Sequence, residues 1–155
     1  MNRRIRVGGH PLHPALTDYP IALLPLALLW DVVALWQGGD FWWKAAFWTL
    51  IAGLAAAIPT AVTGFLDYLS IDRSSAAFRT ATSHMLVMLT AVSCFAGSAI
   101  AHGGPSDVSG GRAAAVIVLA VTGSLLFGIG GWLGGELVFG QGVGVEANES
   151  SCTGR

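Results

Sequence analysis

Four apolar stretches, each about as long as a bilayer is thick, constrain the fold of this chain more than any other feature. They cover residues 17–36, 44–68, 80–101 and 113–139 of the 155 residues. A helix needs about 20 predominantly apolar residues to cross the hydrocarbon core of a membrane. The sequence therefore predicts an all-α integral membrane protein with four transmembrane helices.

The composition supports this prediction and excludes other classes of protein. Only 11% of the residues are charged and 54% are hydrophobic, whereas about 25% of the residues in a soluble domain are charged. A formal net charge of -1 also argues against a nucleic-acid-binding protein, which carries a basic surface. We expect the lipid bilayer to be the main surroundings of the chain, and no nucleic-acid partner.

The segments between the apolar stretches are short, which restricts how the helices can be arranged. Residues 37–43, 69–79 and 102–112 are polar or rich in glycine and serine. Short connections make neighbouring helices antiparallel. The sequence predicts an up-down four-helix bundle, with an N-terminal segment over residues 1–16 and a short tail over residues 140–155 on the same side.

The positions of the basic residues predict the orientation in the membrane. Lys and Arg are enriched on the cytoplasmic side of membrane proteins. Only Lys44 and Arg112 lie on the side away from the termini, whereas the terminal side carries Arg3, Arg4, Arg6, Arg73, Arg79 and Arg155. Both termini are therefore predicted to be cytoplasmic. The alternative is an N-terminal signal peptide, but residues 17–36 are long enough to span and no cleavage site fits well.

Glycines in the fourth stretch predict close helix packing. Gly130 and Gly134 form one GxxxG pair, and Gly131 and Gly135 form another. Small residues at this spacing let helix backbones approach each other closely in lipid. The pairs predict either packing within the bundle, with residues 44–68 as a natural partner, or a face for a homodimer or a larger membrane complex.

Ionisable side chains inside the stretches are the candidate functional residues, because such groups are costly in a membrane. The sequence places most of them near the cytoplasmic side, where His10 and His13 precede the first stretch. A metal ion could be held by nitrogen and oxygen ligands, and a haem group by axial histidines. The metal set is His84, Asp67, Glu136 and Asp18, and the haem set is His84 with His13 or His10.

Each of these residues also has a structural interpretation. Asp18 has the position of a helix N-cap, and the carboxylates of Asp67 and Glu136 could pair with loop arginines. His10 and His13 could shape a turn, and His84 could bond one helix to another. Asp31 lies roughly 20 Å from Asp18 along a helix, and we expect it to pair with Lys44 or Arg112 or to cap the first loop.

The motifs together resemble a family of small bacterial membrane proteins known as domain of unknown function 2231. The resemblance covers residues 8–145 and rests on the opening GHPLHPALTDYP, on Gly64 to Tyr68, on His84 and on the closing GGWLGGELVFGQGVGV. It implies a four-helix membrane domain without an established activity, located in the bacterial inner membrane. Some relatives are joined to Rieske-type iron–sulfur domains, but this chain lacks the Cys and His ligand pattern of such a cluster.

Three functions are compatible with these features. The first is an accessory or structural subunit of a membrane complex. The second is a redox module that binds haem b or a metal ion, and the third is a small proton-coupled transporter. The sequence contains no nucleophile triad, phosphate-binding loop or zinc-ligand spacing, so we do not expect an enzyme. Cys94 and Cys152 give no disulfide framework.

Overall fold

Four long helices make up most of the structure, a computed structural model that describes residues 6–8, 10–106 and 108–145. They are α1 (Leu12–Gln37), α2 (Asp40–Tyr68), α3 (Ala76–His102) and α4 (Gly110–Gly135), and a π-helix, η1 (Glu136–Gly140), continues α4. Two short strands, β1 (Arg6–Val7) and β2 (His10–Pro11), pair antiparallel before α1. All four helices are long and apolar enough to cross a membrane, which confirms the predicted four-helix bundle.

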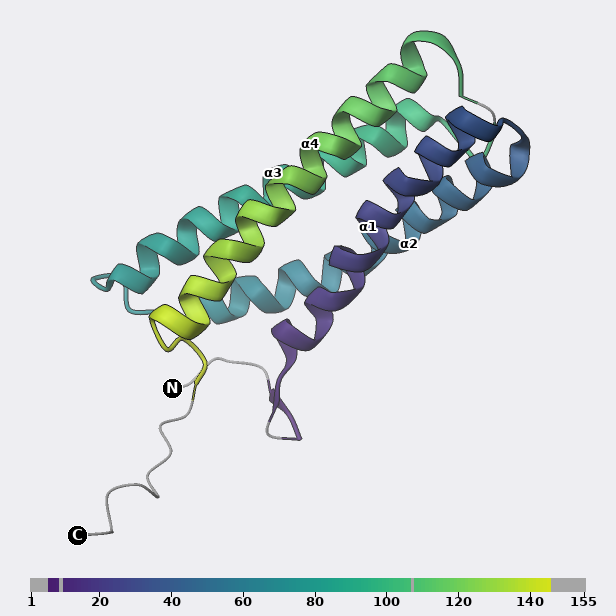
Figure 1. Cartoon of the computed structure of the whole chain (residues 1–155). Coiled ribbons are helices and arrows are strands. Elements are labelled where there is room, and N and C mark those ends of the chain that lie inside the picture. The colour runs from purple at the N-terminus through teal and green to yellow at the C-terminus, as the bar shows by residue number, and fades with distance from the viewer. Residues whose placement is uncertain (1–5, 9, 107, 146–155) are drawn as a thin grey trace, which may run out of the picture.

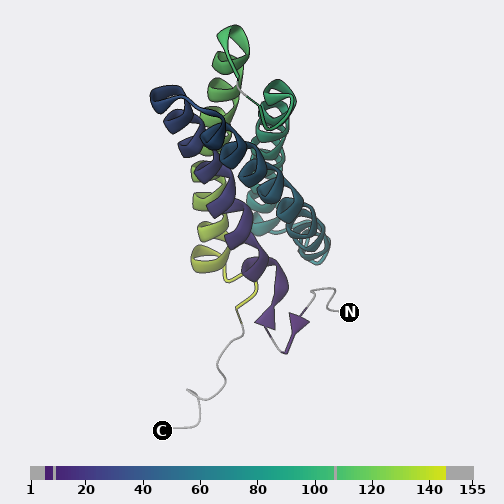
Figure 2. The same ribbon diagram turned by 90° about the vertical axis from the view of Figure 1, so that its right-hand side faces the viewer.

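The helices are arranged as two hairpins (Figure 1). α1 packs along α2 and α3 packs along α4, while α2 meets α3 and α1 meets α4 less extensively. α1 and α3 are therefore diagonal in the bundle, as Figure 2 also shows. The expectation that α2 would be the partner of α4 is wrong, because these two helices are diagonal as well.

The bundle has two ends that differ in composition. We call the end with the β1–β2 hairpin, the α2–α3 loop and η1 the terminal end, and the end with residues 38–39, 103–106 and 108–109 the opposite end (Figure 1). The residues that supported the predicted orientation lie only partly within the described ranges. Arg3, Arg4 and Arg155 are outside them, as are Cys152 and most of the predicted tail.

The helices begin earlier than the apolar stretches do. α1 begins at Leu12 rather than at residue 17, with Pro11 as its N-cap. Pro14 is tolerated because a proline in the first turn has no hydrogen bond to lose there. Asp18 consequently lies inside α1 and is exposed, so its predicted role as an N-cap is wrong. His13 belongs to the helix instead of to the preceding segment.

Local sequence explains the connections between the helices. Gly38 and Gly39 have φ values of 71° and 89°, a conformation that other residues adopt at a steric cost. α3 begins at Ala76 because the Ser75 side chain accepts a hydrogen bond of 3.1 Å from the Phe78 N–H. In the same loop, the backbone N–H and the hydroxyl of Ser74 donate to Asp72 and hold the pKa of its carboxyl group below the usual value.

Buried apolar side chains form two clusters. The larger one lies in the middle of the bundle and includes Leu24, Leu50, Phe95 and Phe127. The smaller one lies toward the opposite end and consists of Ala34, Trp43, Val108, Ala113 and Val116. Of the described residues, those of the terminal third belong to neither cluster.

The two hairpins repeat the same pattern of buried positions. A shift of 70 residues carries the buried positions 43, 46, 50, 53, 57 and 60 of α2 onto the buried positions 113, 116, 120, 123, 127 and 130 of α4. A shift of 71 residues carries positions 20, 24, 27 and 31 of α1 onto 91, 95, 98 and 102 of α3. The bundle therefore consists of two similar hairpins in an approximately twofold arrangement.

The close contacts within each hairpin repeat as well. A Cβ atom at Gly53 would lie 2.6 Å from the Leu24 side chain, and a Cβ atom at Gly123 would lie 2.8 Å from Phe95. Both glycines are required because a large apolar side chain of the partner helix rests directly on their backbone. The repetition includes these contacts, so it extends beyond the general pattern of apolar residues.

Candidate functional site

Two histidines occupy equivalent positions in the two hairpins at the terminal end. His13 lies in α1 and its Nδ1–H donates to the backbone oxygen of Thr60 in α2, at 3.0 Å. His84 lies in α3 and its Nδ1–H donates to the backbone oxygen of Gly130 in α4, at 2.8 Å. The shifts of 71 and 70 residues that relate the hairpins also relate these donors and acceptors.

The two imidazoles lie at a similar depth and close to each other. His84 is eight residues into α3, and Thr60 is eight residues from the end of α2, which places both roughly 12 Å from the α2–α3 loop. The rings of His13 and His84 are near enough for their charges to interact. α1 and α3 are diagonal, so each hairpin contributes one of the two rings.

The positions around the two rings hold small or hydroxyl-bearing residues. A Cβ atom at Gly64 would lie 2.7 Å from the His13 ring, and one at Gly134 would lie 3.3 Å from the His84 ring. Thr60 and Thr63 are buried beside Gly64 on α2. The Thr60 hydroxyl lies 3.1 Å from the oxygen of Leu16, which lacks a helical donor because residue 20 is a proline. The positions of α2 and α4 that face the two rings thus hold small side chains.

The hydrogen bonds determine which nitrogen of each ring is available. A carbonyl oxygen only accepts, so Nδ1 of His13 and of His84 must carry a proton. In the neutral ring Nε2 then holds a free lone pair, and it has no hydrogen-bond partner among the described residues. Metal-binding histidines commonly donate their other N–H to a backbone carbonyl in this way, which fixes the ring and its tautomer.

The other predicted ligands do not join this pair. His10 is exposed on β2 and donates from Nδ1 to the oxygen of Gly8 at 3.1 Å. Asp18 and Glu136 are exposed, and Asp67 is half-buried near the end of α2 with a partner of its own. Within the described ranges no three His, Cys, Asp or Glu side chains are grouped to hold a metal ion. The predicted set of His84, Asp67, Glu136 and Asp18 is therefore not assembled.

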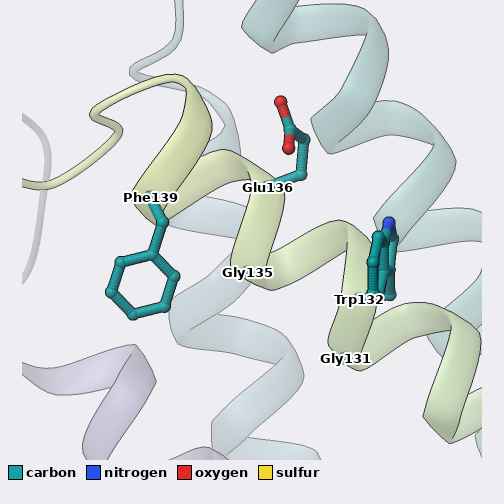
Figure 3. Close-up of a pocket in the computed structure, with 5 residues that line it drawn as sticks. All are labelled: Gly131, Trp132, Gly135, Glu136 and Phe139. Atoms are coloured by element: carbon teal, nitrogen blue, oxygen red, sulfur yellow. The ribbon is translucent and has the colours of Figure 1, made fainter.

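Glu136 lines a shallow hollow on the outer surface of α4 instead. The hollow has a volume of about 370 Å³ and is lined by Gly131, Trp132, Gly135, Glu136 and Phe139. Figure 3 shows Glu136 and Phe139 pointing to different sides of the helix. The depth of Glu136 and His84 predicts that they lie together, because both approach the same end of the bundle, but the Glu136 side chain at the start of η1 is exposed.

The two predicted glycine pairs face different surroundings. Gly130 and Gly134 point into the bundle, where added Cβ atoms would contact Met88 and His84 of α3. Gly131 has open space beside it, and Gly135 has only Phe139 of its own helix nearby. The first pair therefore accounts for packing within the bundle, whereas the second lies on the outer surface.

A second polar pair, which the sequence does not predict, lies at the opposite end. The Nε2 atom of His102 lies 3.1 Å from Oδ1 of Asp31, with 0% and 1% of the two side chains exposed. Asp31 had been expected to pair with Lys44 or Arg112, or to cap a loop. Lys44 instead contacts Asp40 at 3.4 Å. His102 had been assigned to a loop, yet it is the last residue of α3.

The end of α3 explains how His102 becomes buried. Gly103 has a φ of 72° and ends the helix in the left-handed conformation that favours glycine. The chain then turns back, so that the oxygen of Gly104 accepts a 2.9 Å hydrogen bond from Nδ1–H of His102. Arg112 of α4 donates to the backbone oxygens of Ala101 and His102. A cation at the last carbonyls of a helix is favourable.

One spacing in the sequence connects the two pairs. Asp31 follows His13 by eighteen residues, and His102 follows His84 by eighteen residues. Eighteen residues are five turns of about 3.6 residues. His13 and Asp31 therefore lie on the same face of α1, and His84 and His102 lie on the same face of α3. This repeated spacing is the signal that could have identified His102 and its partner.

Comparison with known proteins gives one result. A family model described as "Predicted membrane protein (DUF2231)" matches residues 9–147. No match is found among curated proteins or among solved structures. The match covers the entire helical bundle and both polar pairs. The chain therefore belongs to the DUF2231 family of predicted membrane proteins.

Proposed function

We propose that the protein is a membrane redox module that binds haem b through Nε2 of His13 and Nε2 of His84. The observation that carries this proposal is the matched pair of Nδ1 hydrogen bonds to backbone oxygens of α2 and α4. They fix both rings with Nε2 available, as axial ligands of haem require. A haem held there would exchange single electrons with a partner protein or a lipid-soluble carrier.

The number of ligands favours haem over a metal ion alone. A structural or catalytic zinc ion takes three or four protein ligands, and the described residues contain no group of three candidates. Haem iron takes its in-plane ligands from the porphyrin and needs only axial side chains from the protein. Two histidines related by an approximately twofold arrangement are therefore sufficient for haem and insufficient for zinc.

The surroundings of the two rings also suit a flat apolar cofactor. Helical bundles bind cofactors between facing helices, and the glycines and threonines near His13 and His84 leave the terminal third of the bundle without a cluster of large buried side chains. At the opposite end, the aromatic rings of Trp43 and Phe47 pack against His102. This contrast supports cofactor binding at the terminal end alone.

Haem titration of the purified full chain tests the proposal. We expect the protein in detergent to bind added haem and to develop a Soret band, and His13→Ala and His84→Ala each to lose most of the binding. His10→Ala is the matched control, because His10 is exposed and lies three residues from His13. Failure of the folded protein to bind haem, or unchanged binding in both variants, would contradict the proposal.

A second candidate function is that of a subunit in a larger assembly, through the outer face of α4. Gly131 and Gly135 carry no side chain and lie beside Trp132, which is 80% exposed. Because exposed glycines allow close approach of another helix in lipid, we infer that this face packs against a second copy or another membrane protein. Gly131→Leu should then reduce crosslinking between copies or co-purification, whereas Val118→Leu on the same helix should not. Equal assembly in both variants would contradict it.

We further propose that both termini lie in the cytoplasm and that the protein resides in the bacterial inner membrane. The support is the excess of arginines at the terminal end, because Lys and Arg favour the cytoplasmic side. Reporter fusions test this orientation. A cytoplasmic reporter should be active at the C-terminus and inactive in the α3–α4 loop, and the reverse pattern would contradict the proposal.

A further inference from the structure

Gln141, directly after η1, carries the one side-chain polar atom that the described part of the chain buries without a hydrogen-bond partner. This atom is Oε1, whereas Nε2 of the same amide donates to Oγ1 of Thr80 in α3 at 2.9 Å. Buried polar groups without a partner are unfavourable, and native proteins contain few of them. The buried side of this amide is therefore a candidate for contact with a bound molecule.

Gln141 lies about one helical turn from His84, toward the terminal end. Its partner Thr80 precedes His84 by four residues in α3. Residues four apart share one face of a helix and lie about 6 Å apart along its axis. The Thr80–Gln141 bond and the bond from His84 to Gly130 both join α3 to the continuous stretch of α4 and η1. Gln141 is thus placed between the His84 ring and the terminal end.

The Gln141 amide can meet Thr80 in two orientations. A hydroxyl group donates as well as accepts, and the bond from the Thr80 hydroxyl to the oxygen of Ala76 is long, at 3.4 Å. After a rotation of the amide by 180°, Oε1 accepts from Thr80, and the NH₂ group takes the buried side. The buried side can thus present either an acceptor or a donor, and the donor suits a carboxylate.

We propose that Gln141 donates a hydrogen bond to a carboxylate of the bound haem, an inference that rests on the proposed function. Haem b carries two propionate carboxylates on one edge of an otherwise apolar ring. A carboxylate is costly to bury without polar partners, and the larger apolar cluster fills the middle of the bundle. The carboxylate edge must therefore face the terminal end, on the side of His84 where Gln141 lies.

The haem-free protein gains little stability from an amide at this position. Gln141→Leu removes the buried oxygen that has no partner and loses one hydrogen bond, while the Thr80 hydroxyl keeps its bond to Ala76. A buried polar atom without a partner is more unfavourable than one hydrogen bond is favourable. We therefore expect the haem-free Gln141→Leu variant to be as stable as the wild type or more stable in thermal unfolding, whereas a purely structural role predicts a loss.

Titration of the full chain in detergent with haem and with haem dimethyl ester tests the proposal. The ester keeps the iron and the porphyrin but has no carboxylate. We expect Gln141→Leu to weaken haem binding about tenfold or more, as loss of a hydrogen bond to a charged group implies, and to leave binding of the ester unchanged. Gln37→Leu makes the same substitution at the exposed end of α1 and should change the binding of neither compound.

A second variant keeps the proposal testable if Gln141→Leu does not fold. Gln141→Glu places an acid opposite the haem carboxylate, so haem binding should again weaken about tenfold or more while binding of the ester is retained. In the variant that folds, equal weakening of haem and ester, or no weakening of either, would overturn the role of Gln141. The proposed haem site stands in that case, provided that the wild type binds haem through its histidines. A wild type that binds neither compound would overturn both proposals.

Discussion

At the scale of single residues, the hydrogen-bond partner of each imidazole nitrogen says more about function than the mere presence of a histidine. All four histidines donate from Nδ1 to a backbone oxygen, but the second nitrogen differs in its surroundings. In His102 it faces a buried carboxylate, and in His13 and His84 it has no hydrogen-bond partner among the described residues. His10 makes the same bond on an exposed strand and lacks a buried partner.

The glycine beside His13 gives a prediction at this scale. Gly64→Ala places a methyl group 2.7 Å from the imidazole, so the ring must move or the helices must separate. We expect a loss of about 1–3 kcal/mol of stability, as for other overpacked sites, together with weakened haem binding. Thermal unfolding and haem titration of the variant measure these two effects.

Gly128→Ala is the matched control, because nothing lies within 4 Å of a Cβ atom at this helical position. Alanine is favoured over glycine inside a helix by about 0.5–1 kcal/mol, so this variant should be as stable as the wild type or more stable. If Gly64→Ala is as stable as Gly128→Ala, the result would contradict the close packing of His13 against α2.

At the scale of helices, the sequence predicts the number and type of the secondary-structure elements better than it predicts the residues at which they begin. Apolar length identifies all four helices, but α1, α2, α3 and α4 begin 3 to 5 residues before the apolar stretches do. Hydropathy does not determine where a helix begins: α3 begins at the side-chain cap of Ser75, and the other three helices begin without such a cap. His13 was thus placed outside α1, and His84 was placed at the start of α3 rather than two turns inside it.

The cap of α3 gives a prediction at this scale. Ser75→Ala removes the side-chain oxygen that accepts from the Phe78 N–H, and loss of such a cap typically destabilises a protein by about 1 kcal/mol. Unfolding experiments should detect this loss. Ser83→Ala, on the exposed side of the same helix, should change the stability by less than about 0.5 kcal/mol. Equal effects of the two substitutions would argue against the start of α3 at Ala76.

At the scale of the whole molecule, two similar hairpins each place one histidine near the terminal end, and Asp31 and His102 connect the hairpins at the opposite end. The sequence predicts that histidines and carboxylates gather at the terminal side, and the structure brings only His13 and His84 together there. Hydropathy and loop length give the depth of a residue but not the direction in which its side chain points. That direction depends on how the helices pack, which is why Glu136 and Asp31 were assigned incorrectly.

The equivalent positions of the two hairpins indicate which side chains face the interior, which depth alone does not. His13 and His84 are equivalent under the same shift of 71 residues that relates Asp31 to His102. The pairs differ in their surroundings: small residues border the first, and the aromatic rings of Trp43 and Phe47 pack against the second. This difference supports the proposed cofactor site at the first pair.

The spin state of bound ferric haem is the most direct test of the central claim, which is axial ligation by one histidine from each hairpin. Electron paramagnetic resonance of the haem-loaded wild type and of His10→Ala should show a low-spin, six-coordinate signal. His13→Ala and His84→Ala should each lose this signal, either through a change to high-spin haem or through loss of haem. A low-spin signal that persists unchanged in both single variants would contradict the account.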